Sequence, residues 1–194
     1  PIETSPTHQW TGSSGDNWVL HQLRLDRMLQ AFGDAAIAAA AIQPGEHVLD
    51  IGCGAGATTF AIAERTGPQG RTVGVDISPQ LISRARTDAP ADARVSFRLA
   101  DAATAELEPS GFDLLFSRFG IMFFDDPVAA FAHMRGALKQ DGRIAFACWR
   151  APTENDWVSL PMKAIQGLVA PVPVDPLGRV DKRDSQILLL LIQD

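Results

Sequence analysis

Apolar runs and stretches of helical spacing alternate along most of this chain. Between residues 18 and 32 apolar side chains recur at the spacing of one helix face, with Arg24 and Arg27 on the opposite face. We expect Gly33 to end this helix and residues 34–42 to form a second one. Farther along, strands are predicted at 47–51, 71–76, 94–100, 112–119 and 143–149, and helices at 58–65, 79–87 and 127–139.

The predicted strands are largely continuous in apolar residues, which is typical of a parallel sheet covered by helices on both faces. With right-handed crossovers, such a chain forms an open, doubly wound, mostly parallel α/β sheet. We expect residues 1–194 to form a single domain. After Trp149 the pattern decays: a helix is predicted over 157–168, and the apolar run at 187–192 has no clear period.

Composition narrows the range of partners. Of the 194 residues 46% are hydrophobic and 21% are charged, the formal net charge is −6, and no block of Lys and Arg occurs. Because proteins that grip nucleic acid usually carry a basic stripe, we expect no nucleic-acid partner. The apolar run at 187–192 is far too short to span a bilayer, so no membrane span is expected.

The two cysteines, Cys53 and Cys148, fall in a glycine-rich turn and in a predicted strand. If one strand separates theirs they lie about 10 Å apart, whereas a disulfide needs Cα atoms within about 7 Å. We therefore expect two free thiols and a reducing, cytoplasmic location. A reactive thiolate at Cys53 is the less favoured alternative.

The stretch VLDIGCGAG at 48–56 joins an apolar strand to a helix through a run of alternating glycines. In an open α/β sheet, ligands bind beyond the carboxyl ends of the strands, where this turn lies. One interpretation is a tight turn with no ligand. Another is a dinucleotide site, because Gly52, Gly54 and Ala57 satisfy its fingerprint and Asp76 follows at the end of the next strand, where an acid can hold a ribose.

Asp50 favours a third interpretation. Its carboxylate precedes the turn by two residues, close to where a bound pyrophosphate would lie, and would repel that charge. Beside a cationic ligand with an amino group, the same carboxylate is favourable. S-adenosylmethionine is such a ligand, because it carries a sulfonium, an ammonium, a ribose and an adenine but no phosphate. A carboxylate that only hydrogen-bonds the amides of the turn remains the alternative.

Four motifs occur in order at successive strand ends: VLDIGCGAG at 48–56, VGVDIS at 73–78, FRLADA at 97–102, and the stretch from FSRFGIMFF to FACWR at 116–150. Together they resemble the class I S-adenosylmethionine-dependent methyltransferases, and the last is similar to the bacterial small-molecule branch that includes ubiquinone and menaquinone methyltransferases. The resemblance implies a Rossmann-like fold with S-adenosylmethionine as cofactor, S-adenosylhomocysteine as product and no metal. An NAD(P)-dependent oxidoreductase and an inactive cofactor-binding module remain alternatives.

The resemblance also implies roles for individual residues. Asp50 would orient the methionine ammonium through the turn or a water, Asp76 would accept from both ribose hydroxyls, and Asp101 would accept from the adenine amino group. Ile77 would press on the adenine face, and the amide of Ala102 would meet a ring nitrogen. The other positions implied along the cofactor are Gly52, Cys53, Gly54, Gly56 and Ser117. A strand-end cap at Asp76 and a turn residue at Asp101 are the alternatives.

The acceptor is expected to be a small molecule. The fourth predicted strand ends in SRFG at 117–120, where enzymes that methylate nucleobase or amide nitrogens resemble one another in an Asn/Asp-Pro-Pro-aromatic motif. Trp18, His21 and Arg118 are the candidates for the acceptor side, with packing of the tryptophan and a structural arginine as alternatives. No catalytic base is assigned, because His133 is expected in mid-helix, remote from the ligand end.

The resemblance divides the chain into a helical cap at 1–43, a cofactor-binding core at 46–150 and a partial C-terminal region at 151–194. Five strands are predicted where the family has seven. We therefore expect either that the chain is truncated or that residues between its C-terminal pieces are missing from the sequence. An uncovered fifth strand would expose an edge that can pair with another chain. We therefore expect a second copy of the chain or residues 185–194 to cover that edge, or the backbone to be interrupted within 170–194.

Overall fold

The structure is a computed structural model that describes residues 10–91, 94–149, 160, 163–164 and 187–192. By internal contacts the chain divides into two compact units, residues 1–147 with 189–194, and residues 148–188. Most of the second unit lies outside the described residues, and so does most of the helix predicted over 157–168. The fold is therefore given for the first unit.

Helices and strands alternate in the described part of the chain, as the sequence predicts. In order they are α2 (Ser13–Ala39), β1 (His47–Ile51), α3 (Ala57–Thr66), β2 (Arg71–Asp76), α4 (Pro79–Asp88), β3 (Val95–Leu99), β4 (Phe112–Arg118), α5 (Pro127–Arg135), β5 (Leu138–Trp149) and β6 (Ile187–Ile192), with short 3-10 turns η1 (Gly67–Gln69) and η2 (Ile121–Phe123). The sheet order is β3-β2-β1-β4-β5-β6, and every neighbouring pair from β3 to β5 is parallel. The doubly wound α/β fold is confirmed.

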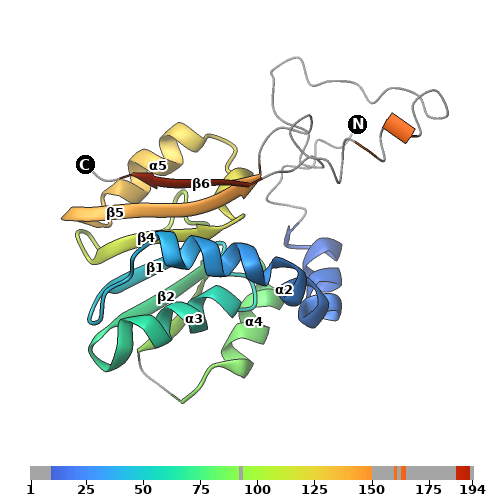
Figure 1. Cartoon of the computed structure of the whole chain (residues 1–194), viewed down its shortest axis with the longest axis horizontal. Helices are drawn as coiled ribbons and strands as arrows, with labels where there is room; N and C mark the ends of the chain where they lie inside the picture. Colours follow the sequence, from blue (N-terminus) through green and yellow to red (C-terminus); the bar gives the residue numbers. More distant parts are fainter. Residues whose placement is uncertain (1–9, 92–93, 150–159, 161–162, 165–186, 193–194) are drawn as a thin grey trace. The chain divides into compact units, whose positions relative to one another are not determined.

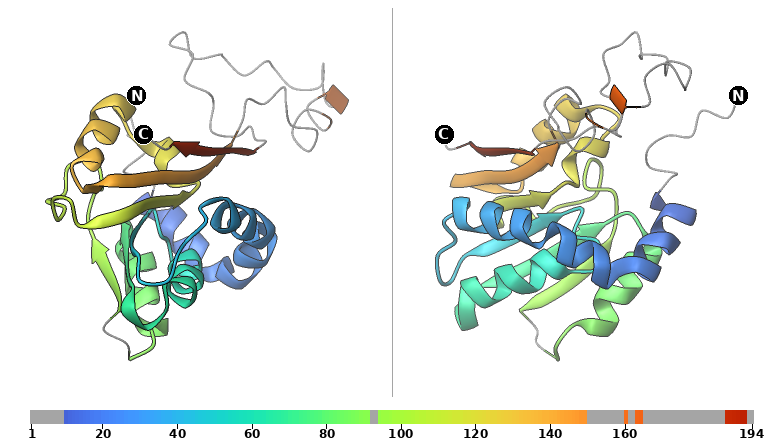
Figure 2. Two further views of the ribbon diagram at one scale, coloured as in Figure 1. Left: turned by 60° about the vertical axis from the view of Figure 1, so that its left-hand side comes forward. Right: turned by 45° about the vertical axis from the view of Figure 1, so that its right-hand side comes forward.

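Helices cover both faces of the sheet. The connections that follow β1 and β2 carry α3 and α4 to one face, and the connection from β4 to β5 carries α5 to the other, as right-handed crossovers require when strand order reverses. Figures 1 and 2 show this arrangement, with α2 on the side of α3. The reversal between β2-β1 and β1-β4 places the carboxyl ends of β1, β2 and β4 around one crevice.

The core is densest in the two central strands. In β1 and β4, the side chains of Val48, Leu49, Leu114, Leu115 and Phe116 are at most 1% exposed. Both strands are covered on both faces, so their apolar residues run continuously rather than alternately. This rigid centre holds the loops that follow each strand.

Two helices begin at the residues that the sequence indicates. Ser78 is the N-cap of α4 with Pro79 at the first helical position, and the carboxylate of Asp126 accepts a hydrogen bond of 3.0 Å from the amide of Ala129 at the start of α5. These caps satisfy amides that the helix itself leaves without acceptors.

We expect Asp126→Ala to lower the free energy of unfolding by about 1 kcal/mol, because one amide of the first turn of α5 loses its acceptor. Asp126→Ser should retain most of the stability, and Asp141→Ala, at an exposed position within β5 (Leu138–Trp149), is the control. Urea unfolding followed by circular dichroism measures all three. An Asp126→Ala variant as stable as the control would exclude this cap as a source of stability.

Gly33 does not end the first helix, contrary to expectation: α2 runs unbroken from Ser13 to Ala39 and includes most of the predicted second helix. Gly33 is buried, and a Cβ atom added to it would lie 3.4 Å from Cδ of Arg118 and 3.6 Å from Cγ2 of Thr58. Glycine within a helix costs about 1 kcal/mol relative to alanine. Close packing under the helix outweighs that cost.

The buried face of α2 also differs from the predicted one. Leu29, Gly33, Ala36 and Ile37 are buried, whereas Met28, expected on the same face, is 60% exposed. A shift of the apolar stripe by one residue has this effect, because neighbouring helix positions point about 100° apart.

The boundary between α5 and β5 lies earlier than predicted. The helix ends at Arg135 rather than Lys139, and β5 already begins at Leu138. The register then jumps: Phe112 pairs with Leu138 and Leu114 with Arg143. Residues 139–142 therefore form a bulge within β5, where a turn ahead of the strand was expected.

The fifth strand has a neighbour in the sheet. Residues 187–192 form β6 at the outer position beside β5. This is one of the three outcomes expected for that edge, namely that the apolar run in residues 185–194 covers it.

Candidate functional site

The site is built on the turn that joins β1 to α3. Gly52, Gly54 and Gly56 have φ values of +66°, +57° and +92°, a region that favours glycine. A Cβ atom added to Gly52 would lie 2.6 Å from Cα of Gly120, so the turn rests directly on the loop after β4. A Cβ added to Gly54 would meet nothing within 4 Å. The turn therefore packs tightly against the loop after β4 at Gly52, and it leaves open space beside Gly54.

Ser117 fixes the contact between these two loops. Its hydroxyl donates to the carbonyl of Ile51 at 2.7 Å and accepts from the amide of Gly120 at 3.1 Å. The side chain is buried at the end of β4. Both hydrogen bonds are internal, so Ser117 supports the turn, and its expected contact with a cofactor stays a prediction.

Gly56 and Cys53 also serve the packing of the turn. A Cβ on Gly56 would lie 2.9 Å from the ring of Phe97 on β3. The Cys53 side chain is buried in a cluster with Ile82 and Phe97, and burial raises the pKa of its thiol well above the ordinary value. Its amide donates to Val75 and its carbonyl accepts from Gly56. The side chain of Cys53 thus has a packing role, and the expected contact of its backbone with a cofactor stays a prediction. A buried thiol with a raised pKa disfavours the reactive-thiolate alternative.

Cys53 and Cys148 are both free thiols, as expected. Cys148 lies on β5, two strands away from β1 in the sheet.

Asp76 links the glycine turn to the end of β2. Its Oδ2 accepts from the amide of Gly54 and its Oδ1 from the amide of Ser78, both at 2.8 Å. Burial raises the pKa of this carboxyl, opposed by those two hydrogen bonds. Each carboxylate oxygen can accept a second hydrogen bond, so the group can cap the loops and still receive two further donors.

Asp50 is wholly buried under the same turn. Its Oδ2 accepts from the hydroxyls of Thr59 at 2.7 Å and Thr58 at 2.8 Å, both on α3. Its Oδ1 has no hydrogen-bond partner among the described residues. Burial raises the pKa of the Asp50 carboxyl to about 6, against the opposing effects of the two hydroxyls and of Arg118. A buried oxygen of this kind is costly unless a donor reaches it.

Arg118 connects the end of β4 to α2. Its Nη2 lies 3.5 Å from Oδ1 of Asp26, its side chain is 11% exposed, and its aliphatic part packs against Gly33. Arg118 is not among the residues that line the cavity described below. These contacts give Arg118 a structural role, and its expected contact with an acceptor stays a prediction.

Asp101 follows β3 and shapes a turn. Its Oδ1 accepts from the amide of Ala103 at 2.9 Å, and its carbonyl accepts from Thr104 and Ala105. Ala102 beside it is buried, and Ile77 is partly exposed next to Asp76. The turn role of Asp101 is present, and its contact with an adenine stays a prediction.

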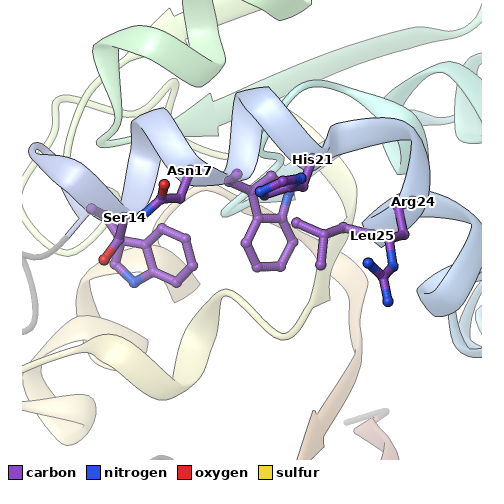
Figure 3. Close-up of a pocket in the computed structure, with 7 residues that line it drawn as sticks. Ser14, Asn17, His21, Arg24 and Leu25 are labelled. Carbon is purple, nitrogen blue, oxygen red and sulfur yellow. The ribbon is translucent and has the colours of Figure 1, made fainter.

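A cavity of about 450 Å³ lies along the first half of α2. Trp10 and Trp18 form an aromatic part of its wall, with ring centroids 5.4 Å apart in an edge-to-face arrangement. Trp10 also contacts the ring of Phe123 in η2, at 5.3 Å between centroids. The remaining lining residues follow one another along the helix in Figure 3: Ser14, Asn17, His21, Arg24 and Leu25.

Two of these residues, Trp18 and His21, were expected on the acceptor side, and the cavity brings them together. Sequence reasoning missed Ser14 and Asn17, and it named Arg24 only as a residue of the polar face of the helix, not as one that lines a cavity. The signal was the i, i+3, i+4 and i+7 spacing from Ser14, which groups Trp18, His21 and Leu25 on one face with Asn17 and Arg24 at its margin. His133 lies elsewhere, with Nε2 2.8 Å from the carbonyl of Ala105.

Within the part of the chain that the structure describes, no group of three or more His, Cys, Asp or Glu side chains is placed to hold a metal ion. No helix among those residues is both long and apolar enough to cross a bilayer.

The chain is similar to known proteins over most of this region. A family model described as a methyltransferase domain matches residues 42–166. The chain is 41% identical over 104 residues to aklanonic acid methyltransferase DauC of Streptomyces sp. (strain C5), a match that covers 53% of this chain and 47% of the relative. It is 33% identical over 137 residues to nocamycin O-methyltransferase of Saccharothrix syringae, covering 68% and 49%. The chain thus spans about half the length of the curated relatives it matches.

The chain is also similar to solved structures of methyltransferases. Phosphoethanolamine N-methyltransferase 2 of Haemonchus contortus, in complex with phosphomonomethylethanolamine and S-adenosylhomocysteine, superposes with a TM-score of 0.58 at 27% identity. The match covers 70% of this chain and 32% of that one.

Proposed function

The chain belongs to the class I S-adenosylmethionine-dependent methyltransferases, and from this premise we propose that it transfers a methyl group from S-adenosylmethionine to a small-molecule acceptor. The two curated relatives are named aklanonic acid methyltransferase and nocamycin O-methyltransferase, and both names support a small-molecule acceptor. Association with a second copy and a cytoplasmic location stay predictions.

The residues of the turn fit this cofactor. Asp76 carries the proposal, because its two oxygens are held at the end of β2 by one amide each and can each take a hydroxyl of an adjacent pair. The space above Gly54 leaves room for a ligand to approach the backbone. The partnerless Oδ1 of Asp50 suits a cationic donor such as an ammonium.

The carboxylate of Asp50 disfavours a dinucleotide. A pyrophosphate against this turn would lie close to this wholly buried acidic side chain, and charges of one sign repel strongly in a poorly solvated site. The matches to known proteins likewise give no support to an oxidoreductase.

S-adenosylmethionine supplies an activated methyl group on a sulfonium sulfur. The chain's own contribution is to align the two reactants, to keep water out and to hold charge at fixed positions. Asp50 and Asp76 would hold the two polar ends of the cofactor, while Ser117 and Gly52 fix the turn between them. No residue of the described part is assigned as a base.

We expect Asp76→Ala to weaken S-adenosylhomocysteine binding about tenfold to a hundredfold, because two ligand donors lose a charged acceptor. Since the carboxylate also holds the amides of Gly54 and Ser78, the variant should lose some stability as well. Asp126→Ala is the control, because it removes a carboxylate that caps α5, the helix on the other face of the sheet from α3. Isothermal titration calorimetry gives the affinities, and thermal unfolding gives the stabilities.

An unchanged affinity of Asp76→Ala would remove Asp76 from the site. Tighter binding of NADH than of S-adenosylhomocysteine by the native chain would favour the oxidoreductase alternative. Binding of the cofactor without methyl transfer to any of a set of phenols, quinones and amines would favour an inactive binding module.

A further inference from the structure

The cavity along α2 lies beside the cofactor turn. The first turn of α2 packs against the loop after β2: a Cβ added to Gly15 would lie 2.7 Å from Oγ of Ser78. The side-chain amide of Gln80 reaches the carbonyl of Thr11 at 3.5 Å. On the other side, Trp10 contacts Phe123, which follows β4. The cavity is therefore anchored at two loops that follow strands β2 and β4 of the site.

The lining combines a flat apolar surface with cationic and hydrogen-bonding groups. Trp10 and Trp18 contribute the apolar surface, His21 lies about one turn beyond Trp18 on the same helix, and Arg24 lies nearly two turns beyond it. Among the described residues no acidic side chain lines the cavity, although the chain as a whole has a formal net charge of −6. Aromatic faces and a guanidinium together suit a planar ligand that carries negative charge.

Arg24 is available for such a ligand. Its side chain is exposed, and among the described residues no carboxylate pairs with it. Arg118, by contrast, is committed to Asp26 and packed under the helix. An arginine on a concave, partly aromatic wall can bind a carboxylate or phenolate through paired N–H donors.

We propose that this cavity binds the methyl acceptor, and that the acceptor is a planar aromatic anion whose ring lies against the tryptophans while its carboxylate or phenolate pairs with Arg24. The inference rests on the proposed methyltransferase function and adds the class of acceptor. The volume of about 450 Å³ holds a molecule of two or three fused rings, within the range of about 300–1,000 Å³ usual for small-molecule pockets.

The test uses two probes of nearly equal shape, 1-hydroxy-2-naphthoate and the neutral 1-hydroxy-2-naphthamide, titrated calorimetrically into the full chain saturated with S-adenosylhomocysteine. The anion should bind at least about tenfold more tightly than the amide. Arg24→Gln should abolish that preference while leaving S-adenosylhomocysteine binding unchanged. Arg27→Gln is the matched control, because Arg27 is exposed on the same helix but does not line the cavity.

Equal binding of the two probes, or loss of the preference in Arg27→Gln as well as in Arg24→Gln, would overturn the proposal. So would failure of both probes to bind a chain that binds S-adenosylhomocysteine. Failure to bind S-adenosylhomocysteine would instead overturn the proposed function, so the two failures are distinguishable.

Discussion

Gly52→Ala is expected to lower the free energy of unfolding by about 3 kcal/mol or more, through two effects that add. A residue with a side chain at φ +66° carries about 1–2 kcal/mol of backbone strain. The new methyl group would also lie 2.6 Å from Cα of Gly120, a backbone atom that cannot move aside without shifting the loop after β4. Overpacking of this kind costs about 1–3 kcal/mol.

Gly54→Ala separates these two effects. Gly54 has nearly the same backbone conformation, φ +57°, but a Cβ there would meet nothing within 4 Å. This variant should lose only the strain, about 1–2 kcal/mol, yet it should weaken S-adenosylhomocysteine binding because its methyl group enters the open space above the turn. Urea unfolding and calorimetry measure both properties for both variants. Equal losses of stability would contradict the close approach of the two loops.

The strands and most helix starts could be predicted because their signals are local. Proline and a capping side chain mark the starts of α4 and α5, and glycines close the turn after β1. Gly33 misled the prediction, since its helix-breaking tendency is a weak local preference and the packing of Arg118 beneath it is a tertiary effect. The bulge at 139–142 likewise depends on pairing with β4, which no local signal in β5 reveals.

For the site, the sequence could indicate where the ligand end lies but not which way each side chain points. Asp76 and the glycines fall where expected, at the ends of β1 and β2. Ser117 at the end of β4 and Cys53 after β1 were also expected at the cofactor, yet their side chains turn to Ile51 and into the core. The direction in which each side chain points depends on the pleat of its strand and on the neighbouring loops. Arg24 was missed as a lining residue because neighbouring helix positions point about 100° apart, so a step of one residue separates a pocket-lining position from a solvent-facing one.

The buried carboxyl of Asp50 should make stability depend on pH in an unusual direction. Its pKa is about 6 in the folded chain, against an ordinary value of 3.8, so the folded state binds the proton more tightly than the unfolded state does. An acid of this kind contributes stability that is fully present below its unfolded pKa and is lost as the pH rises through its folded pKa. Each tenfold difference in proton affinity between the two states corresponds to about 1.4 kcal/mol, so the loss reaches about 3 kcal/mol in all.

Asp50→Asn isolates this contribution, because the amide stays neutral and its oxygen can still accept from Thr58 and Thr59. Between pH 4 and pH 8, unfolding by urea should therefore show the free energy of unfolding of the variant rising relative to that of the native chain, by up to about 3 kcal/mol. Other groups, such as Asp113 with its lowered pKa, are common to both proteins and cancel in the difference.

An ammonium at Oδ1 of Asp50 would stabilise the ionised carboxyl, so the native chain should bind S-adenosylhomocysteine more tightly as the pH rises through 6. Asp50→Asn should lose that pH dependence. Parallel stability curves would show that Asp50 does not titrate in this range. A titrating Asp50 with no matching change in affinity would place the ligand's ammonium elsewhere.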